Sequence, residues 1–273
     1  MKYLLKKSKQ GAQPFLSDVE INVDSPILDF CWTPKGVVFI SDDYVGLVTE
    51  GKIKYPWIRK KVDGLVAVSY NDFSKTCYLS GDNGTSVYKL GLMTKSISPL
   101  ISSEDMKKHM HIPPSRNLVD FAFDRSRTFF WANGVANKIF CIKYKELGVA
   151  AGCGKAGFSV STRLTTSLLS CPCGLLMDGQ TLYVVEKDNR CIRKIEKGKM
   201  TLFAGNPKEG SLFTAPTKIT KLGQSFFVLD GDDIHSVFLM RKETKIQKAY
   251  TGNKIVSIHT DDKQNLLVLE RGN

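Results

Sequence analysis

The chain has few of the residues that most often bind metals or build disulfide frameworks. Its 273 residues include four histidines and seven cysteines. An odd number of scattered cysteines predicts free thiols in a reducing compartment rather than a disulfide framework. His109 and His111 form an H-x-H pair, and Cys171 and Cys173 form a C-x-C pair. Because no second pair follows at the spacing of a zinc site, the sequence predicts no bound metal.

Long apolar runs are missing as well. No run reaches the roughly 20 residues that a membrane-spanning helix needs. Met1–Gln10 carries only a short apolar run between charges, so we expect neither a signal peptide nor membrane insertion. The 15 phenylalanines and 9 tyrosines nevertheless provide for a large core. The composition predicts a soluble, intracellular (cytoplasmic) protein, and it is equally compatible with a component of a virus particle.

The sequence does contain a repeated pattern of short strands. In Asp178–Gly205, turn residues separate β-branched and aromatic runs at hairpin distances, as in an antiparallel meander. A short turn followed by an apolar strand occurs six times, and the third residues of these strands are Phe39, Tyr78, Phe130, Tyr183, Phe227 and Leu267. A period of roughly 40 to 50 residues built from four short strands is typical of propeller blades.

We therefore predict an all-β fold, a six-bladed β-propeller of four-stranded antiparallel blades. Residues 1–273 are expected to form a single domain, with blades at approximately 18–57, 62–100, 117–157, 172–210, 215–252 and 253–273. The last blade lacks two strands, and Lys2–Ser17 matches the part of blade four that it lacks, Arg190–Gly205. Residues 1–17 are therefore expected to complete the C-terminal blade, which would remove two exposed sheet edges.

Blade four also carries a recognisable motif. LYVVEKDNRCIRKI (Leu182–Ile195) is followed by FAGNPKEGSLFTAP (Phe203–Pro216), which joins an acidic and Asn turn, a basic strand, an Ala-Gly turn and a proline. This pattern resembles an NHL repeat, and VAAGCGKAGFS (Val149–Ser159) in blade three is a partial second match. The motif is structural in that family, so the resemblance implies a six-bladed fold rather than an activity.

One stretch imitates a cofactor site. Gly152–Gly157 reads G-x-G-x-x-G, the pattern of a dinucleotide-binding turn. Such a turn must open a helix within a βαβ unit. Here the Ala-Gly-x-x-Lys-x-Gly spacing that begins at Ala151 is repeated one blade later from Ala204. The stretch is therefore interpreted as a loop of the repeat, and no cofactor is predicted.

Groups suited to catalysis are sparse. Asp29, Asp120, Asp124 and Asp178 fall on or beside the expected inner strands, where they would approach a central channel. Asp124 and Asp178 have the sequence context of turn residues, and the other inner strands offer few titratable side chains. We therefore predict that the protein is not an enzyme, and an enzyme acting at the channel mouth is kept as the third hypothesis.

The leading hypothesis is a non-catalytic platform for macromolecules, a structural or scaffold subunit of a larger assembly with protein partners. The expected links Ser98–Asn117 and Gly152–Pro172 are long, and long loops on a rigid scaffold often carry binding sites. Apolar residues of these links are expected to be exposed for protein contact. The candidate partner-binding residues are Met106, Lys107, Lys108, His109, Met110, His111, Ile112 and Phe158.

The second hypothesis is an RNA-binding NHL-type propeller. The net charge is +12, and the expected outer strands carry most of the lysines, whereas the middle turns are acidic. Basic surfaces bind nucleic acid or other polyanions by releasing counterions. The best local candidate is a stretch in which aromatic rings alternate with cations, Tyr55, Trp57, Arg59, Lys60 and Lys61. Two simpler explanations remain open: lysines that block edge pairing and favour solubility, and a Trp57 that packs inward.

Overall fold

The computed structural model of this chain describes residues 1–9, 16–42, 44–58, 62–110, 120–144, 146–160, 163–207, 210–240 and 243–272. Within these residues the strands form six four-stranded antiparallel sheets, with one α-helix and two short 3-10 helices between them. The predicted class, an all-β propeller of six four-stranded blades, is confirmed. The chain forms two compact units of three blades each.

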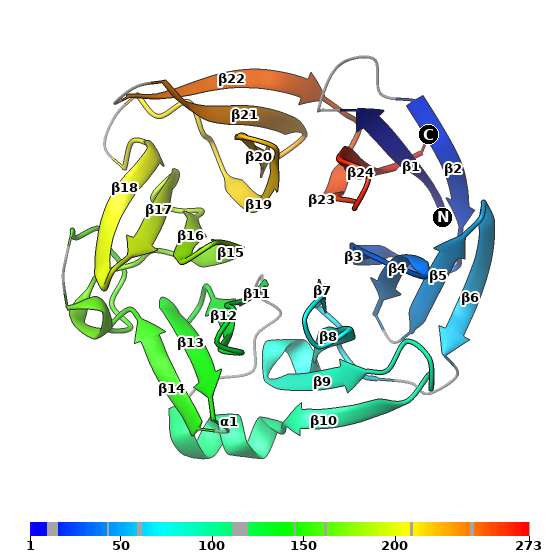
Figure 1. The fold of residues 1–273 in the computed structure, drawn as a ribbon, viewed down its shortest axis with the longest axis horizontal. Coiled ribbons are helices and arrows are strands. Elements are labelled where there is room, and N and C mark those ends of the chain that lie inside the picture. Colours follow the sequence, from blue (N-terminus) through cyan, green and yellow to red (C-terminus); the bar gives the residue numbers. More distant parts are fainter. Residues whose placement is uncertain are drawn as a thin grey trace. The chain divides into compact units, whose positions relative to one another are not determined.

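The first unit consists of Met1–Asn117 and Gly252–Asn273. Figure 1 shows its three blades, each with its strands in a row from the innermost to the outermost. Their strands are β3 (Ile27–Thr33), β4 (Gly36–Ser41), β5 (Val45–Thr49) and β6 (Lys52–Ile58); β7 (Ala67–Asn71), β8 (Thr76–Gly81), β9 (Ser86–Leu90) and β10 (Ile97–Ile101); and β23 (Ile255–Thr260), β24 (Asn265–Arg271), β1 (Lys2–Lys9) and β2 (Leu16–Asn22).

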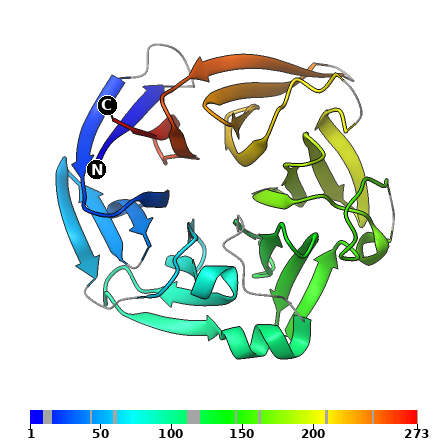
Figure 2. The same cartoon turned by 180° about the vertical axis from the view of Figure 1, so that it is seen from behind.

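The two ends of the chain share one blade of this unit. Strand β1 pairs with β24 from Tyr3 opposite Arg271 to Lys9 opposite Asn265, and β2 covers the other edge of β1. Figure 2 shows the N- and C-terminal labels beside these strands. Completion of the C-terminal blade by the N-terminal strands is thus confirmed. The outer strand extends to Asn22, beyond the expected limit at residue 17, because Ile21 pairs with Tyr3 and both are fully buried.

The second unit consists of Leu118–Thr251. Its three blades follow one another in sequence order, each from an inner to an outer strand (Figure 1). The strands are β11 (Phe121–Phe123), β12 (Phe129–Asn133), β13 (Lys138–Lys143) and β14 (Glu146–Ala151); β15 (Pro172–Asp178), β16 (Thr181–Glu186), β17 (Cys191–Glu196) and β18 (Lys199–Gly205); and β19 (Pro216–Leu222), β20 (Ser225–Asp230), β21 (Asp233–Met240) and β22 (Glu243–Thr251).

The second strand of each blade supplies the residue by which the repeat was recognised. Five of these six side chains are buried, with exposed fractions between 0% for Phe39 and 9% for Tyr78. The strands that carry these five residues are buried along nearly their whole length, as expected of strands packed between neighbouring sheets. Phe130 in β12 is the exception, because it is only partly buried. The packing beside Phe130 is therefore looser than at the equivalent position of the other blades.

Three of the four carboxylates that were considered for catalysis join neighbouring blades instead, and one of them, Asp178, pairs with Lys221 of the next blade at 2.6 Å. In the first unit, Asp29 is 4% exposed and accepts hydrogen bonds from the backbone N–H of Val68 at 3.1 Å and the hydroxyl of Ser257 at 2.7 Å. In the second unit, Asp120 accepts the N–H of Leu175 at 3.1 Å. Asp29 and Asp120 thus each satisfy a buried backbone donor of the next blade.

Replacement of Asp29 tests this structural role. Asp29→Ala leaves the Val68 N–H and the Ser257 hydroxyl without this acceptor, and an orphaned buried donor costs roughly 1–3 kcal/mol. We expect urea denaturation to show a loss of stability of that order. Asp29→Asn, which keeps one acceptor oxygen, should lose less. An unchanged denaturation midpoint for Asp29→Ala would contradict the assignment.

Helix α1 (Ser103–Met110) was not predicted and lies in the first unit. Its start has a capping box. The Ser102 hydroxyl accepts the Asp105 N–H at 3.1 Å, and the Asp105 carboxylate accepts the Ser102 N–H at 3.2 Å. None of the helices described is of the length and apolarity needed to cross a membrane.

Candidate functional site

A cleft of about 540 Å³ opens in the second unit between the sheets β11–β14 and β15–β18. Its lining is apolar in the interior and polar at the mouth. The apolar residues are Phe130, Ala150, Leu164, Met177, Leu182 and Ile195. The mouth is formed by the turn residues Asp124, Arg125, Ser126, Gly179, Gln180, Lys197 and Gly198. The partly buried ring of Phe130 forms part of the interior.

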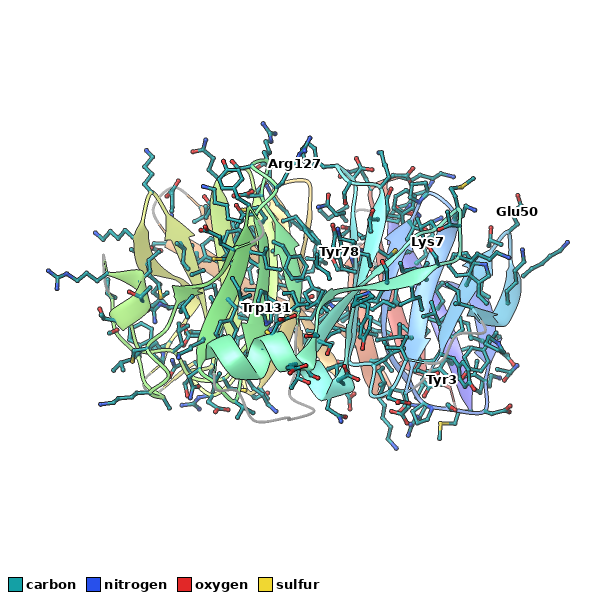
Figure 3. The ribbon with its side chains drawn as sticks, turned by 90° about the horizontal axis from the view of Figure 1, so that it is seen from below. Tyr3, Lys7, Glu50, Tyr78, Arg127 and Trp131 are labelled. Carbon is teal, nitrogen blue, oxygen red and sulfur yellow. The ribbon has the colours of Figure 1, made fainter. Side chains whose placement is uncertain are left out.

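Tight turns place the cations at the mouth. Asp124 holds the β11–β12 turn, because its carboxylate accepts the Thr128 N–H at 2.7 Å and its backbone carbonyl accepts the Arg127 N–H at 3.2 Å. Arg125 therefore projects from the tip of the turn and is exposed. Figure 3 shows Arg127, from the same turn, at the end of the sheets, whereas Trp131 lies within them.

The second cation comes from the β17–β18 turn. Lys197 and Gly198 have φ values of 50° and 73°. Two successive residues with positive φ are typical of a two-residue hairpin turn whose twist matches that of the strands, and glycine at the second position adopts this conformation without strain. Lys197 is exposed at the tip. Its ammonium group can therefore reach a ligand at the mouth of the cleft.

The electrostatics of the mouth favour an anionic group. Arg125 and Lys197 are its two cations, and no ion pair connects either of them with another residue that the structure describes. Asp124 is the one carboxylate in the lining, and it is engaged by the backbone of its own turn. An apolar interior behind two exposed cations is an arrangement for binding an amphipathic, negatively charged group.

One wall of the cleft is formed by the loop between β14 and β15. Leu164 belongs to a single 3-10 turn, η2 (Leu164–Thr166), and its carbonyl accepts the Gly152 N–H at 2.9 Å. Earlier in the same loop, Phe158 stacks on the guanidinium of Arg193, with 4.3 Å between the guanidinium carbon and the ring centroid. Arg193 also donates a hydrogen bond to the Ser159 carbonyl. Blade four thus fixes the loop that presents Leu164.

Arg193 belongs to a fully buried ion pair. Its guanidinium lies 3.3 Å from the Glu186 carboxylate, and both side chains are 0% exposed. Glu186 also accepts the N–H of Ser170 at 2.9 Å and the amide of Asn189 at 2.5 Å. Burial raises the pKa of Glu186 to about 7, even though Arg193 and these hydrogen bonds act in the opposite direction. Asn189 also donates a hydrogen bond to the Gly157 carbonyl. Both Asn189 and Arg193 therefore hold the loop between β14 and β15.

The predicted partner-binding residues are not all exposed. Met106 lies in α1 and is only 1% exposed, which corrects the expectation of an accessible side chain. It packs inward because it follows the capped first turn on the inner face of an amphipathic helix. Lys107, Lys108, His109 and Met110 belong to the same helix, but their side chains, like residues His111 and Ile112 altogether, lie outside the described part of the chain. Phe158 is in the second unit, partly buried against Arg193.

The aromatic candidates for RNA stacking face the core. Trp57 is 8% exposed and belongs to an apolar cluster with Val45 and Ile58. The Tyr55 ring stacks on Phe39 with centroids 5.8 Å apart, and its hydroxyl lies 2.8 Å from that of Ser41. Trp57 packs inward, which agrees with one of the two interpretations of the sequence, and Tyr55 is partly buried with one ring face against Phe39. Arg59, Lys60 and Lys61 lie outside the described residues.

Two other motifs contribute no cofactor site. Gly152–Gly157 lies in the loop after β14 and does not open a helix, so it lacks the context of a dinucleotide-binding turn. Cys173 is buried, with its thiol directed at the carbonyls of Val185 and Pro216, and burial raises the pKa of this thiol well above its usual value. The described residues contain no cluster of three or more histidine, cysteine or acidic side chains that could hold a metal ion.

Sequence reasoning missed the residues that form the cleft. Arg125 and Lys197 were turn residues among many basic ones, and Ala150 was noticed only as part of a degenerate repeat. The cleft could have been found by aligning the repeats and comparing the side-chain volumes at each equivalent position. Such a comparison places a small residue in blade three where blade four has an aromatic one.

The propeller fold of this chain recurs among solved structures. No family model matches the chain, and no curated protein matches it. Virginiamycin B lyase from Staphylococcus aureus is 12% identical, with a TM-score of 0.59, over 98% of this chain and 99% of that one. A chain of a nidogen–laminin complex is also 12% identical, with a TM-score of 0.62 and 98% coverage of both chains.

A third structure covers less. An auxiliary nutrient-binding protein from Bacteroides thetaiotaomicron is 16% identical, with a TM-score of 0.59 over 75% of this chain and 56% of its own length. The structural similarity supports the six-bladed propeller fold of this chain, and at identities this low it supports the fold alone. It does not carry a substrate or a partner from one protein to another, because the same fold supports unrelated functions.

The comparisons correct one prediction from the sequence. We expected that the protein is not an enzyme because few titratable residues were found on the inner strands. A lyase shares the fold along nearly the whole of both chains. Sparse titratable residues on a propeller therefore do not exclude enzymatic activity, and the exclusion is withdrawn.

Proposed function

We propose that this protein is a propeller that binds a partner protein, and that the cleft of the second unit receives a segment of that partner. The observation that carries the proposal is the combination of an apolar interior with two exposed cations, Arg125 and Lys197, at the mouth. A partner segment with apolar and acidic side chains complements both features. A chain of the same fold in a nidogen–laminin complex supports a role in protein association.

The binding surface is built on rigid elements. The cleft walls are strands β12, β14, β15, β16 and β17 together with Leu164 of the β14–β15 loop, which blade four holds in place, and the mouth is formed by tight turns. A site on preformed strands loses little conformational entropy when a partner binds, which favours affinity. A partner segment that enters here would not need to order a loop first.

A display screen with the full-length protein tests the proposal. A library of random 12-residue peptides is selected on the native chain, and the enriched peptides are measured by fluorescence anisotropy. We expect acidic, apolar sequences that compete with one another for a single site. The double variant Arg125→Glu with Lys197→Glu should weaken their binding at least tenfold, because two attractive charges become repulsive.

A matched control uses Lys155→Glu, since Lys155 is exposed in the same unit and does not line the cleft. This variant should retain native affinity. A screen that enriches no competing peptides, or peptides that bind the charge-reversed variant as tightly as the native chain, would refute the proposal. Single-stranded RNA added as a competitor should not displace the peptides. If it displaces them, the RNA-binding hypothesis is favoured instead.

We further infer that blade four is an NHL-type repeat. The Glu186 carboxylate and the Asn189 amide of its acidic turn hold the preceding loop, which is the kind of structural role that the resemblance implies. Asn189→Ala should therefore loosen Gly157 without altering the strands. Faster hydrogen exchange confined to the loop after β14 would support this role, and unchanged exchange there would count against it.

A further inference from the structure

The space between blades four and five is filled by three aromatic rings. The ring centroids of Tyr183 and Phe203 are 4.8 Å apart, those of Tyr183 and Phe226 are 4.7 Å apart, and those of Phe203 and Phe226 are 5.0 Å apart. All three side chains are buried. Tyr183 comes from the second strand of blade four, Phe203 from its outer strand, and Phe226 from the second strand of blade five. These three rings therefore fill the space between the two blades at that level.

The cleft lies at the equivalent place one blade earlier. In blade three the pairing of β13 with the outer strand β14 shifts register between Ile139 and Phe140, and in blade four the pairing of β17 with β18 has the same shift between Ile192 and Arg193. The residue at this bulge is Ala150 in blade three and Phe203 in blade four. Bulges direct a particular side chain, so the two residues are true structural equivalents.

A second ring is missing from the same interface. Leu182 is the second residue of β16, as Phe226 is the second residue of β20. The equivalent of the Tyr183–Phe203–Phe226 cluster is therefore Phe130, Ala150 and Leu182. All three of these residues line the cleft. The chain keeps one aromatic ring there and lacks the other two, and the resulting space is open to solvent at the mouth.

The geometry points to an aromatic side chain as the guest. Resting on the proposed function, we propose that the partner segment inserts an aromatic residue, flanked by acidic residues, into the position that Phe203 occupies one blade later. Phe130 then provides a ring face for the guest, as Tyr183 does for Phe203, and paired rings attract each other beyond the burial of their area. The acidic neighbours of the guest lie at the mouth against Arg125 and Lys197.

The chain itself supplies the most direct test. Ala150→Phe introduces the residue that blade four uses at the same bulge, so it should fill the cleft with the protein's own aromatic ring. We expect this variant to fold and to melt at or above the native temperature, because a cavity is filled. Its affinity for a labelled peptide with a central phenylalanine between glutamates should fall at least tenfold. Ala156→Phe, which adds the same ring at an exposed loop position, should bind normally.

A peptide series separates this inference from the proposed function. Peptides of one length carry phenylalanine, leucine or alanine at the centre and glutamate or glutamine on either side. We expect phenylalanine to bind at least five times more tightly than leucine, and glutamate flanks to bind more tightly than glutamine flanks. The aromatic inference is overturned if leucine binds as well as phenylalanine, or if Ala150→Phe retains native affinity while folded. The proposed function survives that result if the selected peptides still depend on the two cations at the mouth.

Discussion

Deletion of residues 1–17 is expected to abolish cooperative folding of the first unit. Strand β1 is an interior strand of its blade, paired with β24 on one edge and β2 on the other. Its removal deletes Tyr3 and Leu5, which are 0% and 5% exposed, from the cluster that contains Leu267 and Leu269. Two such side chains contribute about 1.5–3 kcal/mol each through burial alone. The deletion also removes two ladders of hydrogen bonds, one between β1 and β24 and one between β1 and β2.

The total effect is large on the scale of protein stability, which is typically about 5–15 kcal/mol for a domain. We expect the truncated chain to lose its sharp thermal transition, as measured by calorimetry and circular dichroism. Two substitutions keep the test informative if the truncated chain is insoluble. Leu5→Ala should cost roughly 2–5 kcal/mol in urea denaturation, whereas Lys9→Ala on the same strand, where the side chain is exposed, should cost little. A truncated chain that melts like the native protein would disprove the role of β1.

Replacement of Arg193 by methionine is expected to destabilise the second unit by about 3–5 kcal/mol at pH 8. The substitution removes the cation of a buried pair and leaves the Glu186 carboxylate with only the Ser170 and Asn189 donors. The loss also frees Phe158, which stacks on the guanidinium. Denaturation followed by tryptophan fluorescence measures the effect, and hydrogen exchange should rise first in the loop around Ser159.

The loss of stability caused by Arg193→Met should depend on pH, and the pKa of Glu186 determines the direction of this dependence. That pKa is about 7 in the folded chain, above its ordinary value of 4.5, because burial disfavours the charged form. The folded state therefore keeps a proton that the unfolded state has released, and this group's contribution to stability falls as the pH rises from about 4.5 to about 7. Without Arg193 the pKa rises further and the decline continues above pH 7. Arg193→Met should thus cost less at pH 5.5 than at pH 8.

A double variant distinguishes charge from packing. Glu186→Gln combined with Arg193→Met removes both charges and keeps an acceptor for the Ser170 N–H. Because uncharged replacements of a buried pair are often close to neutral, this variant should recover most of the lost stability and lose the pH dependence. Equal instability of the single and double variants at every pH would show that packing of the guanidinium against Phe158, rather than the ion pair, holds the loop.

The sequence was sufficient to predict the fold because the repeat appears in the strands themselves. A turn followed by an apolar strand with an aromatic third residue identified the second strand of the blades, and the missing strands of the last blade identified the role of β1. The limit of the outer strand at Asn22 was missed, since pairing with Tyr3 is a long-range contact that no local pattern reports. Helix α1 was missed although Ser102 and Asp105 form a capping-box pattern in the sequence.

The candidate site was harder to predict, for a physical reason. Partner-binding residues were sought in long links and basic stretches, where function commonly lies. Met106 is buried and Trp57 packs inward, because their burial depends on neighbours distant in the sequence. The cleft exists because Ala150 and Leu182 are smaller than the aromatic residues at the equivalent positions one blade later. A smaller side chain at one position produces no sequence motif. The cleft becomes visible when the blades are superimposed and their interior residues are compared.

The shared bulge of blades three and four has a consequence for how proteins of this kind diversify. Blades that share the same backbone can differ in the side chain at one bulge, and the size of that side chain decides whether the space beside it is filled. Ala150 and Phe203 stand in this relation. A change of one such side chain can therefore create a recognition surface without redesign of the scaffold.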